Sequence, residues 1–368
     1  MTVQFSIINS RRHIFASDNG ITTPEGKKYD GMQKIFKLSD IHPAQIMING
    51  CMEFEGIPME TLINEFVKKT KLKDLKNIED IKNEFLNFLA IYTPESSGDE
   101  YLHYAVENFK ENITQEINEK GFDKAIEARK KKKIYQFIRK YSRFKNEFEK
   151  IIPEDKDCKI YSKILWEIFS YELKYEGTGV IISGHNIGSP YPSFFEINIH
   201  CNSRGKIIYE ELESKIDFEE TIIRVHAINE EGYAFFTGVN EDFVEFINEH
   251  IEKTNQIILK KLKSKLKKEN IDSEDKIIRI LEIILNEEFN ELNNIFNYFR
   301  VESMNETSKS IEFIPNNLLC ILADEIIRLT ALKQKISSAD EYVSMTSHIS
   351  LMNKTNGFKW VKFNDEII

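Results

Sequence analysis

The sequence predicts an α+β fold in which two antiparallel sheets carry helices on their outer faces. Three observations lead to this prediction. Four short strand patterns come before the first helix pattern. Strand patterns return in the middle of the chain and again near its end. Charged helical stretches separate these groups, so the order is strands, helix, strands, helices and strands.

The first strands follow directly from the N-terminal sequence. Apolar and polar residues alternate at Val3–Ile8, and a turn at 9–11 leads to a second apolar run at His13–Ala16. Together they predict a β-hairpin. After a loop rich in Gly, Thr and Pro, two further strands are predicted at Lys34–Leu38 and Gln45–Ile48.

The remaining elements are predicted from periodicity and turn signals. Pro58 opens a helix, and helical sequence continues from about 68 to 173. We then expect strands at Gly177–Ile182 and Phe194–Ile199, a strand end at Phe235–Gly238, a helix from about Asn240 to about Glu302, a helix at Asn317–Ala331, and strands at Ile349–Met352 and Phe358–Val361. Residues 1–67, 174–250 and 303–368 are expected to form one core, with helical insertions at 68–173 and 251–302.

Composition narrows the classes of protein. Of the 368 residues, 41% are apolar, and no run reaches the 18 apolar residues that a membrane span needs, so we expect a cytoplasmic protein without a membrane partner. The net charge of −10 makes the chain as a whole an unlikely nucleic-acid binder. The histidines are dispersed and no cysteines form a C-x-x-C pair, so no metal or other cofactor is expected. The cysteines are Cys51, Cys158, Cys201 and Cys320.

One basic segment is an exception to the acidic composition. Residues 128–145 hold nine lysines and arginines interleaved with aromatic residues. An exposed amphipathic helix whose aromatic face packs on the protein explains this pattern, because charge runs usually mark solvated faces. The alternative is a helix that docks a nucleic acid or a partner protein.

The N-terminal sequence also holds a triplet of chemically useful side chains. Thr2, Asp18 and Lys34 follow one another at two equal intervals of 16 residues. Because Thr is small, an aminopeptidase is expected to remove Met1, which leaves Thr2 with both a hydroxyl nucleophile and a free α-amine. A Thr hydroxyl needs a neighbouring base, and a terminal amine with a pKa near about 8 supplies one without histidine.

The segments around this triplet resemble a known family. The segments that carry the resemblance are Phe15–Asp18, Lys34–Phe36, Met47–Gly50 and the helix after Pro58. They are similar to the N-terminal half of proteasome β-subunits and HslV-type proteases, which are N-terminal-nucleophile (Ntn) hydrolases. The resemblance covers residues 2–67 well, 177–250 and 317–362 less closely, and the helical insertions not at all. It implies a four-layer αββα sandwich of two antiparallel sheets flanked by helices.

The resemblance implies a role for each matching residue. Thr2 would be the nucleophile. Asp18 and Lys34 would orient it and favour its reactive protonation state, since a nearby ammonium lowers the pKa of the terminal amine. The backbone N–H of Gly50 would line an oxyanion hole. The backbone of Thr22 would pair with an extended peptide substrate.

A C-terminal element resembles the family less closely. Glu341 and Ser344 match an acidic-x-x-Ser element that supports the active site, although Met345 and Thr346 stand where two glycines are expected. Thr237 takes the place of another supporting serine.

Ordinary structural explanations exist for the same residues. Asp18 could close an Asx turn, Lys34 could be a solvated lysine at a strand edge, and Gly50 could be a turn glycine. Glu341 and Ser344 could cap a turn.

Two functions are open from the sequence. The first is a proteasome-like threonine hydrolase that cleaves amide bonds of a peptide or protein through a Thr2 acyl-enzyme, without a cofactor. The second is a catalytically silent scaffold or regulatory subunit that uses its helical insertions for assembly or partner binding. Since homologous subunits form rings, the resemblance also implies a homo-oligomer.

Overall fold

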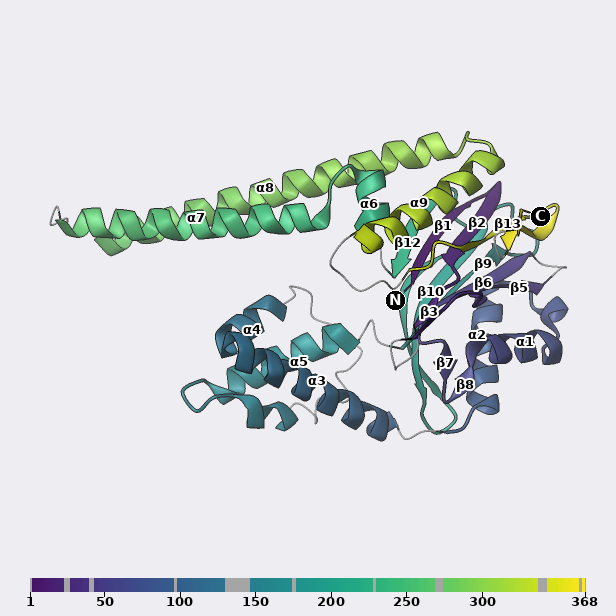
Figure 1. Cartoon of the computed structure of the whole chain (residues 1–368), viewed down its shortest axis with the longest axis horizontal. Coiled ribbons are helices and arrows are strands. Elements are labelled where there is room, and N and C mark those ends of the chain that lie inside the picture. Colours follow the sequence, from purple (N-terminus) through teal and green to yellow (C-terminus); the bar gives the residue numbers. More distant parts are fainter. Residues whose placement is uncertain are drawn as a thin grey trace.

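The computed structural model describes residues 2–22, 27–39, 43–95, 98–129, 146–173, 177–227, 230–268, 274–336, 343–363 and 366–367. Within these ranges the chain is an α+β protein with two large antiparallel sheets, as the sequence predicts (Figure 1). Most of the basic segment, residues 130–145, lies outside the described residues, and both of its interpretations stay predictions.

The first sheet has six strands in the order β12-β1-β2-β13-β14-β15. They are β1 (Val3–Asn9), β2 (Arg12–Asp18), β12 (Ile222–Ala227), β13 (Ser347–Asn353), β14 (Gly357–Phe363) and β15 (Glu366–Ile367). The N-terminal hairpin lies inside the sheet, because β12 flanks β1 and β13 flanks β2. Every residue of β1 and β2 is consequently buried.

The second sheet has five strands in the order β11-β10-β9-β6-β5. They are β5 (Ile35–Ser39), β6 (Ala44–Gly50), β9 (Thr178–His185), β10 (Pro192–Asn202) and β11 (Ile207–Lys215). Two small ribbons complete the strands: β3 (Ile21–Thr22) with β4 (Lys28–Tyr29), and β7 (Glu53–Phe54) with β8 (Ile57–Pro58).

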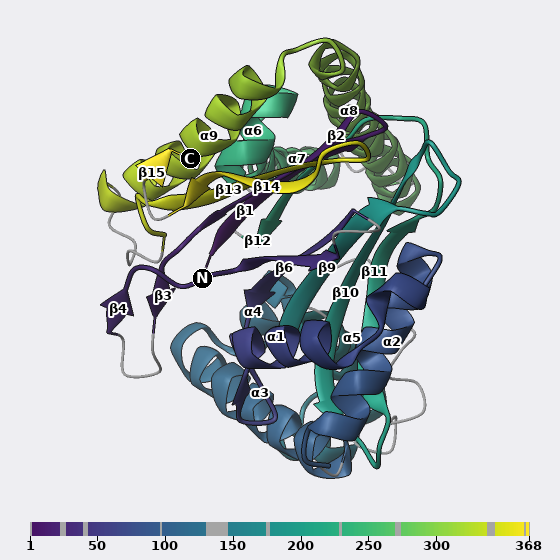
Figure 2. The ribbon, with the colours of Figure 1, turned by 90° about the vertical axis from the view of Figure 1, so that its right-hand side faces the viewer.

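Helices cover the outer faces of both sheets, as Figure 2 shows. On the six-stranded sheet lie α6 (Glu230–Thr237) and α9 (Asn316–Ile336), which share one hydrophobic cluster with it. On the five-stranded sheet lie α1 (Met59–Lys69) and α2 (Ile78–Tyr92), with the 3-10 helix Leu72–Asp74 between them in sequence. The inner faces of the two sheets meet around a third cluster that includes Phe15, Met47 and Phe194.

The helices α3 (Gly98–Lys120), α4 (Phe122–Arg129) and α5 (Cys158–Leu173) pack around a cluster of their own that includes Phe109 and Phe148. The range 68–173 therefore contains two kinds of helix, because α2 packs on the sheet and α3 to α5 pack on one another. None of the described helices has the length and apolar character needed to cross a membrane.

Three edge strands, β11, β12 and the two-residue β15, escape prediction from the sequence, and the first two are the longer ones. The first carries Glu210, Glu211 and Glu213, and the second carries Arg224 and His226. Edge strands commonly bear charged residues, which weakens the apolar pattern that marks a strand.

The predicted strand end at Phe235–Gly238 is wrong, because this segment belongs to helix α6. Tyr233 and Phe236 are three residues apart and both pack into the cluster on the six-stranded sheet. The ring of Phe236 stacks on that of Phe5 with centroids 5.4 Å apart. Gly238 has a φ of +69° and ends the helix.

The single helix predicted from Asn240 to Glu302 is also wrong. The chain forms two helices instead, α7 (Glu241–Lys268) and α8 (Glu274–Ile311), which run side by side as a long hairpin away from the sheets (Figure 1). The side-chain amide of Asn248 donates to that of Asn293 over 2.9 Å and fixes the level at which they pair.

A buried histidine pair bridges the two sheets. Nε2 of His13 on β2 lies 3.0 Å from Nε2 of His185 on β9, and His13 Nδ1 lies 3.1 Å from the Ser183 hydroxyl. Burial, together with the charge of His185, lowers the pKa of His13 well below 6.5. Burial also lowers the pKa of His185. Both rings are therefore neutral in the folded protein near pH 7.

We expect acidification to destabilise the protein through this pair. Below pH 6.5 the unfolded chain binds more protons than the folded chain. The pair therefore does not reduce the free energy of unfolding above that pH. This free energy then falls as the pH decreases toward the lowered pKa values, by about 1.4 kcal/mol per pH unit for each histidine. Urea unfolding between pH 5 and 8, about the range in which histidine titrates, measures this slope. His13→Gln should flatten it, and an unchanged slope would contradict the assignment.

Candidate active site

The structure brings the side chains of Thr2, Asp18 and Lys34 into direct contact. Thr2 precedes β1, Asp18 ends β2 and Lys34 precedes β5, so the group joins both sheets. The Thr2 hydroxyl donates to Asp18 Oδ1, and Lys34 Nζ donates to Thr2 Oγ1. Lys34 Nζ also lies 3.0 Å from Asp18 Oδ1. Only 4% of Thr2, none of Asp18 and 1% of Lys34 is exposed.

The registers of the two hairpins explain this meeting. Gln4 pairs with Ser17 across β1 and β2, which places Thr2 beside Asp18 at the end of the ladder. The N–H of Ile48 on β6 donates to the carbonyl of Lys34 over 2.9 Å. This end of the five-stranded sheet is held against β1, because Gln4 Nε2 donates to the carbonyl of Ile48 over 2.5 Å.

Asp18 is the centre of the hydrogen-bond network. Its Oδ1 accepts from the backbone N–H of Val3 at 3.1 Å, and its Oδ2 accepts from the N–H of Gly20 at 3.1 Å and of Ser344 at 3.3 Å. The bond to Gly20 is an Asx-turn contact, so Asp18 closes a turn and also contacts Thr2 and Lys34. Three chain segments thus fix one carboxylate.

Lys34 is a buried cation and not a solvated edge lysine. Burial lowers its pKa, and the nearby carboxylate of Asp18 opposes that shift. An ammonium in contact with Thr2 Oγ1 stabilises negative charge on that oxygen and disfavours a second positive charge nearby. This electrostatic setting suits a hydroxyl nucleophile with an amine base.

Gly50 lies at the end of β6 with a φ of +73°, and a Cβ at this position would come within 2.4 Å of the Gly177 carbonyl oxygen. Only glycine fits that backbone without a shift. The N–H groups of a strand alternate in direction, so the Gly50 N–H points to the same side as that of Ile48, toward Lys34. It is therefore directed to the side of β6 on which the triplet lies.

The segment after α9 reaches the same place. The Ser344 hydroxyl lies 2.7 Å from that of Thr346, which in turn donates to the side chain of Asn19. The N–H of Asn19 donates to the carbonyl of Thr346 over 3.2 Å. The Thr346 side chain thus adds hydrogen bonds at this position, while Met345 packs into the cluster under α9. Glu341 lies outside the described residues.

Thr237 and Thr22 have other surroundings. The Thr237 hydroxyl donates to the carbonyls of Tyr233 at 2.8 Å and Val239 at 3.1 Å, so it caps the end of α6. Thr22 lies on β3, where its backbone is in register with Lys28 on β4. The short ribbon follows the Asp18 turn directly.

Sequence reasoning missed a second polar group between the sheets. The Ser6 hydroxyl lies 3.0 Å from His226 Nε2, and His226 Nδ1 lies 2.9 Å from Glu196 Oε1. The order resembles a serine hydrolase triad. Ser6 has no exposed surface, so a substrate carbonyl has no access to it, and the group links β1, β12 and β10 instead.

Among the described residues, no group of three or more His, Cys, Asp or Glu side chains could hold a metal ion. The Thr2 hydroxyl contacts one carboxylate and one ammonium, and such groups can hold or transfer protons.

Comparisons with known proteins add little to this geometry. No family model and no curated protein matches the chain. Among solved structures, the Anbu (Gly-1) mutant from Hyphomicrobium sp. strain MC1 is similar at 11% sequence identity, with a TM-score of 0.29. The alignment covers 64% of this chain and 65% of that chain. A likeness at this score carries no argument about fold or function.

Proposed function

We propose that the chain is an Ntn hydrolase, a proteasome-like threonine hydrolase that cleaves amide bonds of peptides or proteins. The observation that carries the proposal is the buried contact of the Thr2 hydroxyl with the Asp18 carboxylate and the Lys34 ammonium. Buried charged groups around one hydroxyl are costly to maintain unless they do chemistry or hold the fold.

The proposal includes the four-layer αββα sandwich of this class. Helices α6 and α9, the two sheets, and helices α1 and α2 would be its layers. We place the first insertion after α2, because α3 to α5 share a separate cluster. The hairpin of α7 and α8 would be the second insertion.

The proposed reaction begins once Met1 has been removed. Thr2 Oγ1 attacks the substrate carbonyl carbon, and the hydroxyl proton passes through a water molecule to the α-amine of Thr2. The Gly50 N–H stabilises the oxyanion of the tetrahedral intermediate. The C–N bond then breaks and the departing amine takes the proton, which leaves an acyl ester on Thr2. Water then hydrolyses the ester, and the α-amine of Thr2 accepts the proton of this water and passes it to Thr2 Oγ1.

Intact-protein mass spectrometry after incubation with a peptide epoxyketone tests the proposal. This reagent bonds to both the hydroxyl and the α-amine of an N-terminal Thr. We expect loss of Met1 and a gain of one inhibitor mass. Thr2→Ala should show neither the adduct nor peptide hydrolysis while keeping its circular dichroism spectrum.

Two results would contradict the proposal, and the first of them would favour the scaffold. Retained Met1 without an adduct would remove the amine base from the proposed reaction, and equal hydrolysis by Thr2→Ala would place the chemistry elsewhere. The scaffold draws support from the long exposed hairpin, which lies outside the site.

A further inference from the structure

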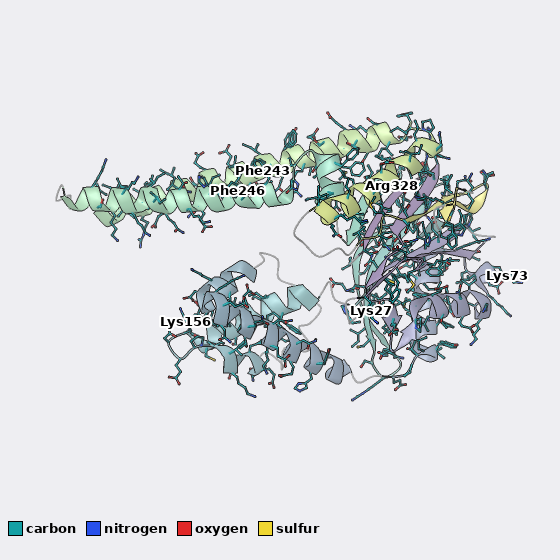
Figure 3. The ribbon with its side chains drawn as sticks, in the orientation of Figure 1. Lys27, Lys73, Lys156, Phe243, Phe246 and Arg328 are labelled. Atoms are coloured by element: carbon teal, nitrogen blue, oxygen red, sulfur yellow. The ribbon has the colours of Figure 1, made fainter. Side chains whose placement is uncertain are left out.

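The hairpin of α7 and α8 exposes large apolar side chains along much of its length. Half or more of Phe243, Phe246 and Ile257 on α7 is exposed, and the same holds for Ile295 and Tyr298 on α8 (Figure 3 labels the two phenylalanines). Large apolar side chains that gather on one exposed surface commonly mark an interface.

These side chains gather on one broad face of the hairpin. A helix turns by about 100° per residue, so Phe243, Phe246 and Ile257 lie on one stripe of α7, turned about 140° from the seam that contacts α8. Ile284 and Ile295 lie on a stripe of α8 that is turned about 100° from its own seam in the same sense. In two antiparallel helices, rotation from the seam in the same sense leads to the same side of the pair.

Charge changes sign along this same face. Near the tip, Lys261 and Lys265 of α7 are exposed. Farther back toward the sheets, Glu288 and Glu291 of α8 are exposed on the same side. Since Asn248 lies opposite Asn293, the two lysines stand about 8–15 residues nearer the tip than the two glutamates, or roughly 12–23 Å at 1.5 Å per residue.

We propose that this face binds the same face of a second copy of the chain, with the two hairpins antiparallel. Reversal of one hairpin about the level of Ile257 and Ile284 brings the basic tip of each copy over the acidic middle of the other, and it brings these isoleucines of the two copies together. The result is a four-helix bundle with a two-fold axis, an isologous contact that closes on itself. The same charges would repel in a parallel pair, tip against tip.

A pair of neighbouring residues supplies a matched test. Ile284 is 45% exposed and lies on the apolar face, whereas Ile283 is 52% exposed and points to the opposite side of the hairpin. Glu is as good a helix former as Ile, so neither substitution should unfold the hairpin. By sedimentation velocity of the full chain, Ile284→Glu should halve the assembly mass relative to wild type, and Ile283→Glu should leave that mass unchanged.

Charge reversal tests the orientation. Lys261→Glu combined with Lys265→Glu should weaken the assembly, and so should Glu288→Lys combined with Glu291→Lys. Mixing the two double variants should restore it, because each tip then meets an opposite charge on the other copy.

Several outcomes would overturn the proposal. A wild-type chain that stays monomeric would do so, as would an assembly whose mass is the same in Ile284→Glu and Ile283→Glu. Monomers that bind lipid vesicles through the face would assign it to a membrane surface instead. Failure of the double variants to restore assembly on mixing would exclude the antiparallel arrangement.

Discussion

Replacing Lys34 with methionine is expected to lower peptide hydrolysis by about 10²–10⁴-fold, the range typical of groups that assist proton transfer. The protein should stay folded. Methionine is similar in length but carries no charge, so Thr2 loses the ammonium that contacts its hydroxyl. Asp18 keeps its backbone N–H donors from Val3, Gly20 and Ser344, so its carboxylate is not left without partners. Measured kcat and thermal unfolding separate the two effects.

Lys37→Met is the matched control, because Lys37 lies three residues farther along, on β5, and is exposed. It should leave kcat unchanged. If Lys34→Met retains wild-type kcat, Lys34 has no part in the reaction. If Lys34→Met unfolds instead, the lysine acts mainly in the fold. Lys34→Met should then be no more stable than Asp18→Ala.

Replacing Asp18 with alanine should have the larger effect on stability, with a loss of about 3–5 kcal/mol in the free energy of unfolding. This substitution leaves the buried Lys34 ammonium without its counter-charge and deprives three backbone N–H groups of their acceptor. The double variant Asp18→Ala with Lys34→Met removes both charges, so it should be more stable than Asp18→Ala alone. Urea unfolding of the single and double variants measures the difference.

The order of stabilities decides between two accounts of the site. A double variant no more stable than Asp18→Ala would show that the lost N–H acceptor, and not the unpaired ammonium, sets the cost. Equal stability of Asp18→Ala and Lys34→Met would contradict the central position of Asp18 in the network.

Local sequence patterns predicted the inner strands of the sheets but missed several edge strands. The buried strands β1, β2, β6 and β9 lie near their predicted ranges, because apolar runs between turn residues mark such strands well. The edge strands β11 and β12 carry charges and were missed. Helix α6 was mistaken for a strand, because Phe235 and Phe236 form a short apolar run. The contact of Phe236 with Phe5 is tertiary and leaves no local sequence signal.

The sequence likewise predicted part of the candidate site and missed the rest. The spacing of Thr2, Asp18 and Lys34, read with the family resemblance, predicted side chains that the structure places in contact. The roles assigned to them stay predictions. The donors around Asp18 escaped notice because they are backbone N–H groups, which leave no residue signature. The bonds of Thr346 were also missed, since its partner Asn19 is 327 positions away in the sequence.

The link between Ser344 and Asp18 has a consequence for the timing of synthesis. The two residues are 326 positions apart, so at about 5–20 residues per second roughly 16–65 s pass between their additions to the growing chain. Strand β13, which flanks β2, also arrives only after that delay. In the folded chain only 4% of Thr2 is exposed. The proposed function therefore requires that Met1 be removed before the late segment closes over Thr2.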